Sequence, residues 1–223
     1  LATFAVFLIS RAAGDPLDLY ANSGYGLSEE GERALRKKLA LDRPVVVQYG
    51  LWLGKTLQGD MGETLLERKP VTRTITQRLP ATIHLGLVAF VGSFAVGIPL
   101  GILSAVKRGS LLDYCGRFIA LLGQAVPQFW LGLVLIFIFA VQLRLLPAGL
   151  RGDGLWDVKH LILPSITMAS GGLAYYTRIT RTAMLQVLDS EYIRLARAKG
   201  VSNNVVIWKH AFKNAIIQPL TGM

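Results

Sequence analysis

The sequence predicts an all-α membrane protein, and three observations support this prediction. The 223-residue chain is 52% hydrophobic and only 17% charged, against roughly 25% charged residues in a typical soluble domain. Its mean hydropathy is +0.44. Two runs, Ile83 to Val106 and Phe118 to Leu143, contain no charged side chain. Each exceeds the roughly 20 residues that a helix needs to cross the hydrocarbon core of a bilayer.

The two ends of the sequence are short apolar stretches. The first ten residues, LATFAVFLIS, are too few to span a bilayer, and another apolar stretch starts at about residue 215. We interpret residues 1–10 as the end of a first transmembrane helix and the last stretch as the start of a further span, so that the chain is clipped at both ends. A cleaved signal peptide fits the start less well, because no basic segment precedes it.

Residues 11–79 have mixed charge and several turn residues, which indicates a water-facing insertion. Ser28 is expected to cap a helix through EEGERALRKKLAL. Its acidic residues lie in the first turn and its lysines near the last, as the helix dipole favours. A second helix is expected after Pro44, through VVVQYGLWLGKTL, with its end at GDMG. Both helices are expected to lie on the membrane surface or on the rest of the subunit.

Three spanning segments are predicted after Pro80, at about residues 83–106, 118–143 and 161–177. The third contains small and polar residues but carries no charge before Arg178. An arginine at mid-bilayer costs about 2.5 to 3.5 kcal/mol on insertion scales, so Arg178 and Arg181 are expected to mark the end of this span.

The loop charges predict the orientation of the spans. The segment 178–213 holds seven basic residues against two acids, and the loop around Lys107 holds three against Asp113. Because basic residues concentrate in short cytoplasmic loops, both segments are predicted to be cytoplasmic. The insertion 11–79 then lies outside, and its own basic residues do not contradict this, because long loops translocate largely regardless of charge.

No pattern of a catalytic or metal site is present in the sequence. His84, His160 and His210 lack the spacing that places two metal ligands on one helix face. A phosphate loop and a nucleophile elbow are absent, so neither enzymatic activity nor an ATP site or other cofactor is expected on this chain. The net charge is +10, but the basic residues flank apolar runs and form no nucleic-acid-binding motif, which argues against a nucleic-acid partner.

Four residues within the spans are candidates for a pathway or a hinge: Gln124, Pro127, Gln128 and Pro99. A glutamine in hydrocarbon needs a partner or water, so both glutamines are expected to face the bundle interior. For Gln124 an interhelical hydrogen bond is slightly favoured over a place in the pathway. Pro99, which two glycines flank, is expected to bend its helix or pack it closely, with a gating hinge as the weaker alternative.

The most informative segment is DSEYIRLARAKG. Residues 190–199 suit a short helix, Gly200 is placed to end it in the left-handed conformation, and Ser202 can cap the next helix. These elements would form a compact cytoplasmic protrusion, and Ala196 and Ala198 would let a partner approach its backbone closely. An ordinary basic loop that only sets the orientation is an equally good interpretation of the residues alone.

EYIRLARAKG and the downstream KHAFKNA resemble the cytoplasmic coupling loop of ABC importer permeases, in particular the dipeptide/oligopeptide/nickel branch. The resemblance implies a type I ABC importer transmembrane helix bundle over residues 80–223, with an extracytoplasmic helical insertion and a coupling loop over 178–214. It also implies a multi-pass protein of the bacterial or archaeal cytoplasmic membrane. Supporting stretches are AAGDP, LDRPVVVQY, GDMG, RLPATIHLG, VPQFWLGLVLI, LPAGL and YYTRITRTAMLQVL.

The resemblance further implies that this segment docks into a cleft of a separate ATP-binding subunit. The general family pattern has Glu-Ala-Ala ahead of the glycine, whereas here Arg194 and Leu195 occupy the first two places and only Ala196 agrees. The implied coupling residues are Glu191, Tyr192, Arg194, Ala196, Arg197, Ala198, Lys199 and Gly200.

The function that the resemblance implies is that of a permease subunit, which forms half of the translocation pathway of an ATP-driven importer for peptides or similar small solutes. The implied partners are a homologous second permease subunit, two ATP-binding cassette subunits that bind the ATP, an extracytoplasmic solute-binding protein and the lipid membrane. The alternative is a stand-alone channel or secondary transporter. A membrane enzyme is disfavoured because the spans hold no convergent titratable groups. Peptide, nickel and other small solutes are all compatible with the resemblance.

Overall fold

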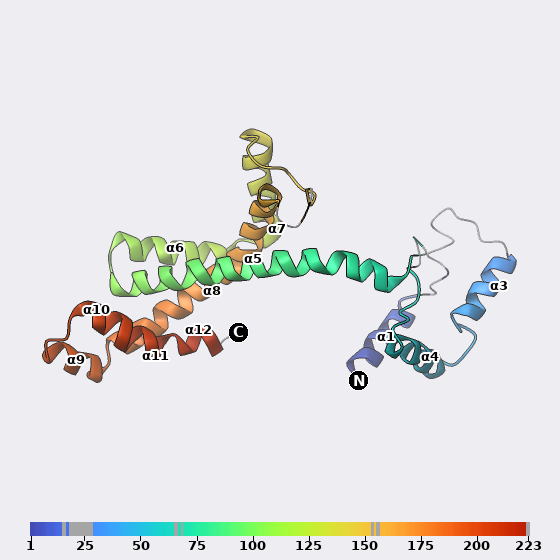
Figure 1. The fold of residues 1–223 in the computed structure, drawn as a ribbon, viewed down its shortest axis with the longest axis horizontal. Helices are drawn as coiled ribbons and strands as arrows, with labels where there is room; N and C mark the ends of the chain where they lie inside the picture. The colour runs from blue at the N-terminus through green and yellow to red at the C-terminus, as the bar shows by residue number, and fades with distance from the viewer. Residues whose placement is uncertain are drawn as a thin grey trace. The chain divides into compact units, whose positions relative to one another are not determined.

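The computed structural model describes residues 1–14, 17, 29–64, 67, 69–152, 154 and 157–221. These residues form helices and turns, with one isolated β-bridge between Glu63 and Pro70, which confirms the all-α prediction. The chain divides into two compact units, Leu1–Pro80 and Ala81–Met223 (Figure 1).

The first unit contains helices α1 (Ala2–Ala12), α3 (Glu29–Lys38) and α4 (Val45–Leu57). Helix α4 has the predicted bounds, whereas α3 ends before the predicted LAL, just ahead of Ala40 at φ 52°. The Ser28 cap lies outside the described residues. Aromatic contacts join α1 to α4, since the rings of Phe4 and Tyr49 are 4.9 Å apart and the two hydroxyl oxygens of Thr3 and Tyr49 are 2.9 Å apart.

Helix α5 (Val71–Val106) contains the predicted span 83–106 but begins well before it. In the part of the chain that the structure describes, α5 is the one unbent helix with the length and apolarity to cross a membrane. The pair of helices that follows it would make a second span if the two are counted together. Several spans per chain therefore remain a prediction.

The predicted span 118–143 is not one continuous helix. Helix α6 (Leu111–Ala125) is followed by α7 (Gln128–Leu135), which continues as the π-helical stretch η1 (Ile136–Gln142), and the chain bends by 108° between α6 and α7. The bend lies at Val126, whose backbone is extended with φ −86° and ψ 123°. Proline disfavours the helical conformation of the residue before it, so Pro127 explains why the helix breaks here.

Helix α8 (Val158–Leu188) contains the predicted span 161–177 and continues past Arg178 and Arg181. The predicted loop 178–214 is therefore largely helical. After α8 come α9 (Glu191–Ala198), α10 (Asn203–Val205), the π-helical stretch η2 (Val206–Phe212), α11 (Lys213–Ala215) and α12 (Ile217–Thr221).

The core of the second unit lies where α5, α8, α9 and the segment from η2 to α11 meet. Met184, Ile193, Val206 and Ala211 are completely buried there. The other buried members of this core cluster are Ile98, Ile102, Ala105, Tyr176, Ala183, Ile207 and Ala215. By contrast, α6 exposes a row of large apolar side chains, which marks a surface that meets lipid or another protein.

Candidate functional site

Helix α9 is fixed to the core by one face. Ile193 has no exposed surface, and the half-buried Ala196 and Val201 pack against the same core cluster. Spacings of three and five residues place these side chains on the inner side of the helix and of the turn that follows. The remaining surface of α9 faces outward, so the predicted protrusion has an anchored inner side and a free outer side.

The end of α9 has the predicted glycine stop. Gly200 has φ +78°, and its N–H donates to the Arg197 carbonyl oxygen at 3.0 Å. The Val201 N–H donates to the Ala196 carbonyl oxygen at 3.2 Å, which completes a glycine-based C-terminal cap. A Cβ at Gly200 would meet no atom within 4 Å, so the backbone angle, and not the available space, favours glycine here.

The outward face of α9 combines charge with apolar surface. Arg194 donates to Glu191 at 2.9 Å, and both side chains are largely exposed. Leu195 is 57% exposed and Tyr192 44% exposed. Leu195 stood out in the sequence only as a departure from the family pattern, whereas the structure places it on this face. The rest of the outward face consists of Arg197, Ala198, Lys199 and Gly200.

Of the two alanines expected to keep the docking surface low, only Ala198 is exposed, because Ala196 turns toward the core. Tyr192 makes a hydrogen bond that the sequence did not indicate. Its hydroxyl accepts from Asn214 at 3.0 Å, and the same Asn214 amide donates to the His210 carbonyl oxygen at 3.0 Å. This contact ties α9 to the helical segment that follows it.

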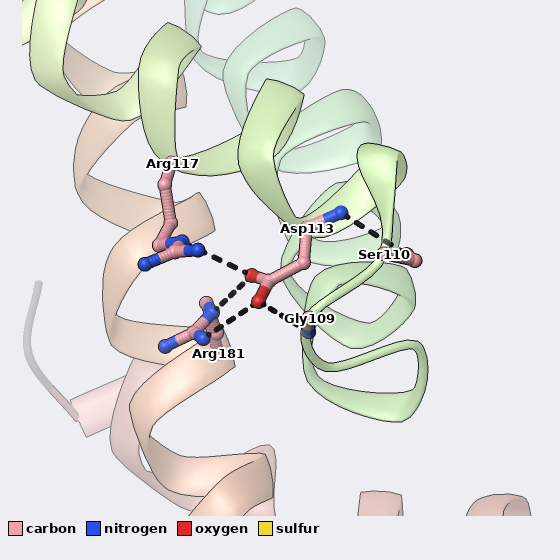
Figure 2. A network of polar contacts seen from close by, with 5 residues as sticks. All are labelled: Gly109, Ser110, Asp113, Arg117 and Arg181. Carbon is pink, nitrogen blue, oxygen red and sulfur yellow. Dashed lines mark hydrogen bonds and ion pairs between the residues drawn. The ribbon is translucent and has the colours of Figure 1, made fainter.

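A buried carboxylate joins α6 to α8 (Figure 2). Asp113 is 1% exposed and receives two hydrogen bonds from Arg181, at 2.7 Å to Oδ1 and 3.1 Å to Oδ2. The Gly109 N–H donates to Oδ2 at 3.0 Å, and the Arg117 Nε lies 3.5 Å from Oδ1. Both carboxylate oxygens are therefore satisfied, as a charge buried in a protein requires.

This ion pair was missed in the sequence. Asp113 was counted only as a loop charge and Arg181 only as the end of a span, and 68 residues separate them. The one signal available was the isolation of Asp113, a single acid beside two apolar runs. Nothing in that signal identifies its partner.

The four pathway or hinge candidates lie at different places. Gln124 accepts a hydrogen bond from Arg178 at 2.9 Å, which gives it the interhelical bond expected for it. Gln124 and Gln128 are both exposed in this chain by itself, and their expected place facing the bundle interior stays a prediction. Gly123 of α6 packs closely on Ser170 and Ala174 of α8, whereas Gln128, at the start of α7, lies beside Gly171 of α8.

The two prolines differ as well. Pro127 caps α7 at the 108° bend, whereas Pro99 lies inside α5. Beside Pro99, a Cβ on Gly97 would lie 2.9 Å from the Tyr176 Cβ, and one on Gly101 would lie 2.7 Å from the Thr177 carbonyl oxygen. Close packing of α5 on α8 is thus the feature found there.

Two of the histidines share a cavity of about 570 Å³. His84 and His160 line it together with Gly132, Pro147 and Met168, and most of its wall is apolar. Among the residues that the structure describes, no group of three or more side chains could hold a metal ion.

Comparisons with known proteins agree with the resemblance seen in the sequence. Residues 97–223 match the family described as binding-protein-dependent transport system inner membrane component. A putative peptide transport system permease protein of Brucella suis is 40% identical over 225 residues, which cover 99% of this chain and 71% of the relative. The oligopeptide transport system permease protein AppB of Bacillus subtilis is 39% identical over 227 residues, with 98% and 71% covered. The dipeptide transport system permease protein DppB of Alkalihalophilus pseudofirmus is 40% identical over 245 residues, with 99% and 72% covered.

Proposed function

Because this chain belongs to the family of inner membrane components of binding-protein-dependent transport systems, we propose that it forms half of the translocation pathway of an ATP-driven importer. The solutes are peptides or similar small molecules, since the relatives carry the names of peptide, oligopeptide and dipeptide transport permeases. A homologous second permease subunit completes the pathway. Two ATP-binding subunits supply the energy, and an extracytoplasmic binding protein delivers the solute.

The observation that carries the coupling proposal is the way α9 is held. Its inner side is anchored by Ile193, and Tyr192 ties it to the helical segment after it. Only Asp189 and Ser190 separate it from α8. A helix held in this way transmits a push instead of absorbing it, and its exposed outer face offers Leu195 as an apolar contact within a charged rim.

In the proposed mechanism, closure of the ATP-binding subunits displaces α9 as a rigid lever. The displacement passes to α8 and rocks the bundle between inward-open and outward-open states. The strongly basic segment from Arg178 to Lys213 supports a cytoplasmic position for α9, where the ATP-binding subunits act in this proposal. The chain itself binds no ATP in this mechanism.

Replacement of Gly200 by valine tests the lever. A side chain at φ +78° costs about 1–2 kcal/mol, and more when it is β-branched, so the end of α9 is expected to change shape. The complex in reconstituted vesicles should then hydrolyse ATP with little uptake, while insertion into the membrane stays normal. The matched control is Gly59→Val, which has φ +86°, equally open surroundings and a place in the other unit. Unchanged uptake by the Gly200→Val complex would rule out the coupling role.

A stand-alone channel or secondary transporter is the alternative function, and co-purification separates the two. A permease of this kind should be isolated from its native membrane with an ATP-binding subunit in stable stoichiometry. Solute flux in vesicles that contain this chain alone would instead support the alternative.

A further inference from the structure

A second cavity, of about 280 Å³, lies between α6 and α8 beside the Asp113 network. Three arginines line it: Arg117, Arg178 and Arg181. Three basic side chains around one small cavity are unusual in a protein that faces hydrocarbon, because each costs free energy there unless it is hydrated or paired. The cavity therefore needs an explanation beyond packing.

The positive charge of this cavity is only partly neutralised. Arg181 donates hydrogen bonds to both carboxylate oxygens of Asp113, and the Arg117 Nε lies 3.5 Å from the nearer of them. Arg178 donates to the neutral Gln124. Within the described part of the chain, no second carboxylate lies within ion-pair distance of Arg117 or Arg178. One carboxylate thus faces three guanidinium groups, which leaves an excess of about two positive charges.

Hydrogen-bond donors remain available around the cavity. Each guanidinium group has five N–H donors. Arg117 has its contact with Asp113 and lies over the Tyr114 ring, 4.5 Å from the ring centroid, and Arg178 donates once to Gln124. Thr177 also lines the cavity, and its buried hydroxyl has no hydrogen-bond partner among the described residues. A ligand with several acceptor oxygens and negative charge would satisfy these groups.

The rim of the cavity is apolar on the α6 side. Leu121 lines the cavity and is 65% exposed, and Phe118 and Tyr114, one and two helical turns away, are 60% and 58% exposed. Their spacing along the sequence puts them on one face of α6. A basic cavity that opens beside an apolar helix face matches an anionic phospholipid, whose phosphate and acyl chains need these two environments.

We propose that this cavity binds the headgroup phosphate of an anionic phospholipid. Arg117 and Arg178 hold the phosphate oxygens, and the acyl chains run along the exposed face of α6. The charge pattern of the loops places the cavity near the cytoplasmic leaflet. The proposal depends on the inner-membrane location that the family shares, and it is independent of the docking of α9 to an ATP-binding subunit.

Native mass spectrometry of the purified complex in detergent tests this site, with phosphatidylglycerol and phosphatidylcholine as the two probes. The wild-type complex should retain phosphatidylglycerol more tightly than phosphatidylcholine. In the double variant Arg117→Gln/Arg178→Gln, phosphatidylglycerol binding should weaken roughly 30-fold, since each basic residue near an anionic bilayer surface contributes a factor of about five. Phosphatidylcholine binding should not change.

The matched control is the double variant Lys107→Gln/Arg108→Gln. It removes the same charge from the neighbouring loop, outside the cavity, and should bind phosphatidylglycerol as the wild type does. A second variant, Arg117→Lys/Arg178→Lys, keeps the charge and should retain most of the binding, which separates loss of the site from loss of the fold.

Four results would overturn the proposal. The first is wild-type affinity of the Arg117→Gln/Arg178→Gln complex for phosphatidylglycerol, and the second is an equal loss in the loop control. The third is displacement of the lipid by millimolar inorganic phosphate, which would identify a free-anion site. The fourth is loss of the second permease subunit from the Arg117→Gln/Arg178→Gln complex without any change in lipid binding, which would identify an acidic side chain of that subunit as the ligand.

Discussion

The ion pair between Asp113 and Arg181 is expected to respond asymmetrically to removal of its two partners. Asp113→Leu leaves Arg181, which is only 20% exposed, without its carboxylate, and leaves the Gly109 N–H without an acceptor. Removal of one partner of a buried pair costs about 3–5 kcal/mol of unfolding free energy. We expect Asp113→Leu to fall in this range.

Arg181→Met is expected to cost less. Asp113 would keep the Gly109 N–H at 3.0 Å and the Arg117 guanidinium at 3.5 Å, so its charge would not be isolated. The double variant replaces both charges by apolar side chains, and such replacements of buried pairs are often close to neutral. The summed loss of unfolding free energy in the two single variants should therefore exceed the loss in the double variant by at least about 2 kcal/mol.

The assay is reversible unfolding of the subunit in mixed detergent micelles, followed by tryptophan fluorescence. Arg117→Met serves as the control, because Arg117 is 47% exposed and lies 3.5 Å from the carboxylate, so it should cost no more than about 1 kcal/mol. If the costs of Asp113→Leu and Arg181→Met are additive within about 0.5 kcal/mol, the pair does not act as a unit and the reasoning fails.

Three further predictions concern the helix contacts. Gly101→Ala places a Cβ 2.7 Å from a backbone carbonyl oxygen of α8 and should cost about 1–3 kcal/mol in the same unfolding assay, whereas Gly92→Ala, with open space around it, should cost nothing. Ile193→Ala removes a fully buried side chain under α9 and should cost about 2–5 kcal/mol in the same unfolding assay. Tyr192→Phe removes the acceptor for Asn214 and should speed amide exchange in α9 without lowering the melting temperature of the whole subunit, since one hydrogen bond contributes about 0.5–1.5 kcal/mol.

Features with a local cause were readable from the sequence. The bounds of α4 follow from Pro44 at its start and the glycine turn after it, and the end of α9 follows from Gly200. In each case the residue that sets the conformation is within a few positions of the element it limits. Capping and stop signals are therefore sufficient there without any knowledge of tertiary packing.

Helix ends inside charged segments were not readable in this way. Hydropathy marks where a helix can lie in hydrocarbon, not where its hydrogen bonds begin or end. Helix α5 therefore starts well before Ile83, and α8 runs on through Arg178 and Arg181 to Leu188. The break at Val126 had a local signal in Pro127, but the apolar run around it was long enough to predict one uninterrupted span.

Contacts between distant segments account for the rest. Nothing near Asp113 in the sequence specifies Arg181, and their pairing depends on how α6 lies against α8. The inward side of Ala196 likewise depends on the core built by α5, α8 and η2. These features combine residues from several helices, so periodicity within one helix cannot place them.

The arrangement of α8 indicates where a movement of α9 would be felt. Helix α8 is joined to α5 by the close packing at Gly97 and Gly101 and to α6 by the buried carboxylate of Asp113. Both contacts resist sliding, because one has no spare space and the other has fixed bidentate geometry. In the proposed mechanism α5, α6 and α8 therefore move as one body. The first break in regular structure beyond them is at Val126 and Pro127, so we expect the change in shape to be concentrated in α7 and η1, where no buried side chain restrains it.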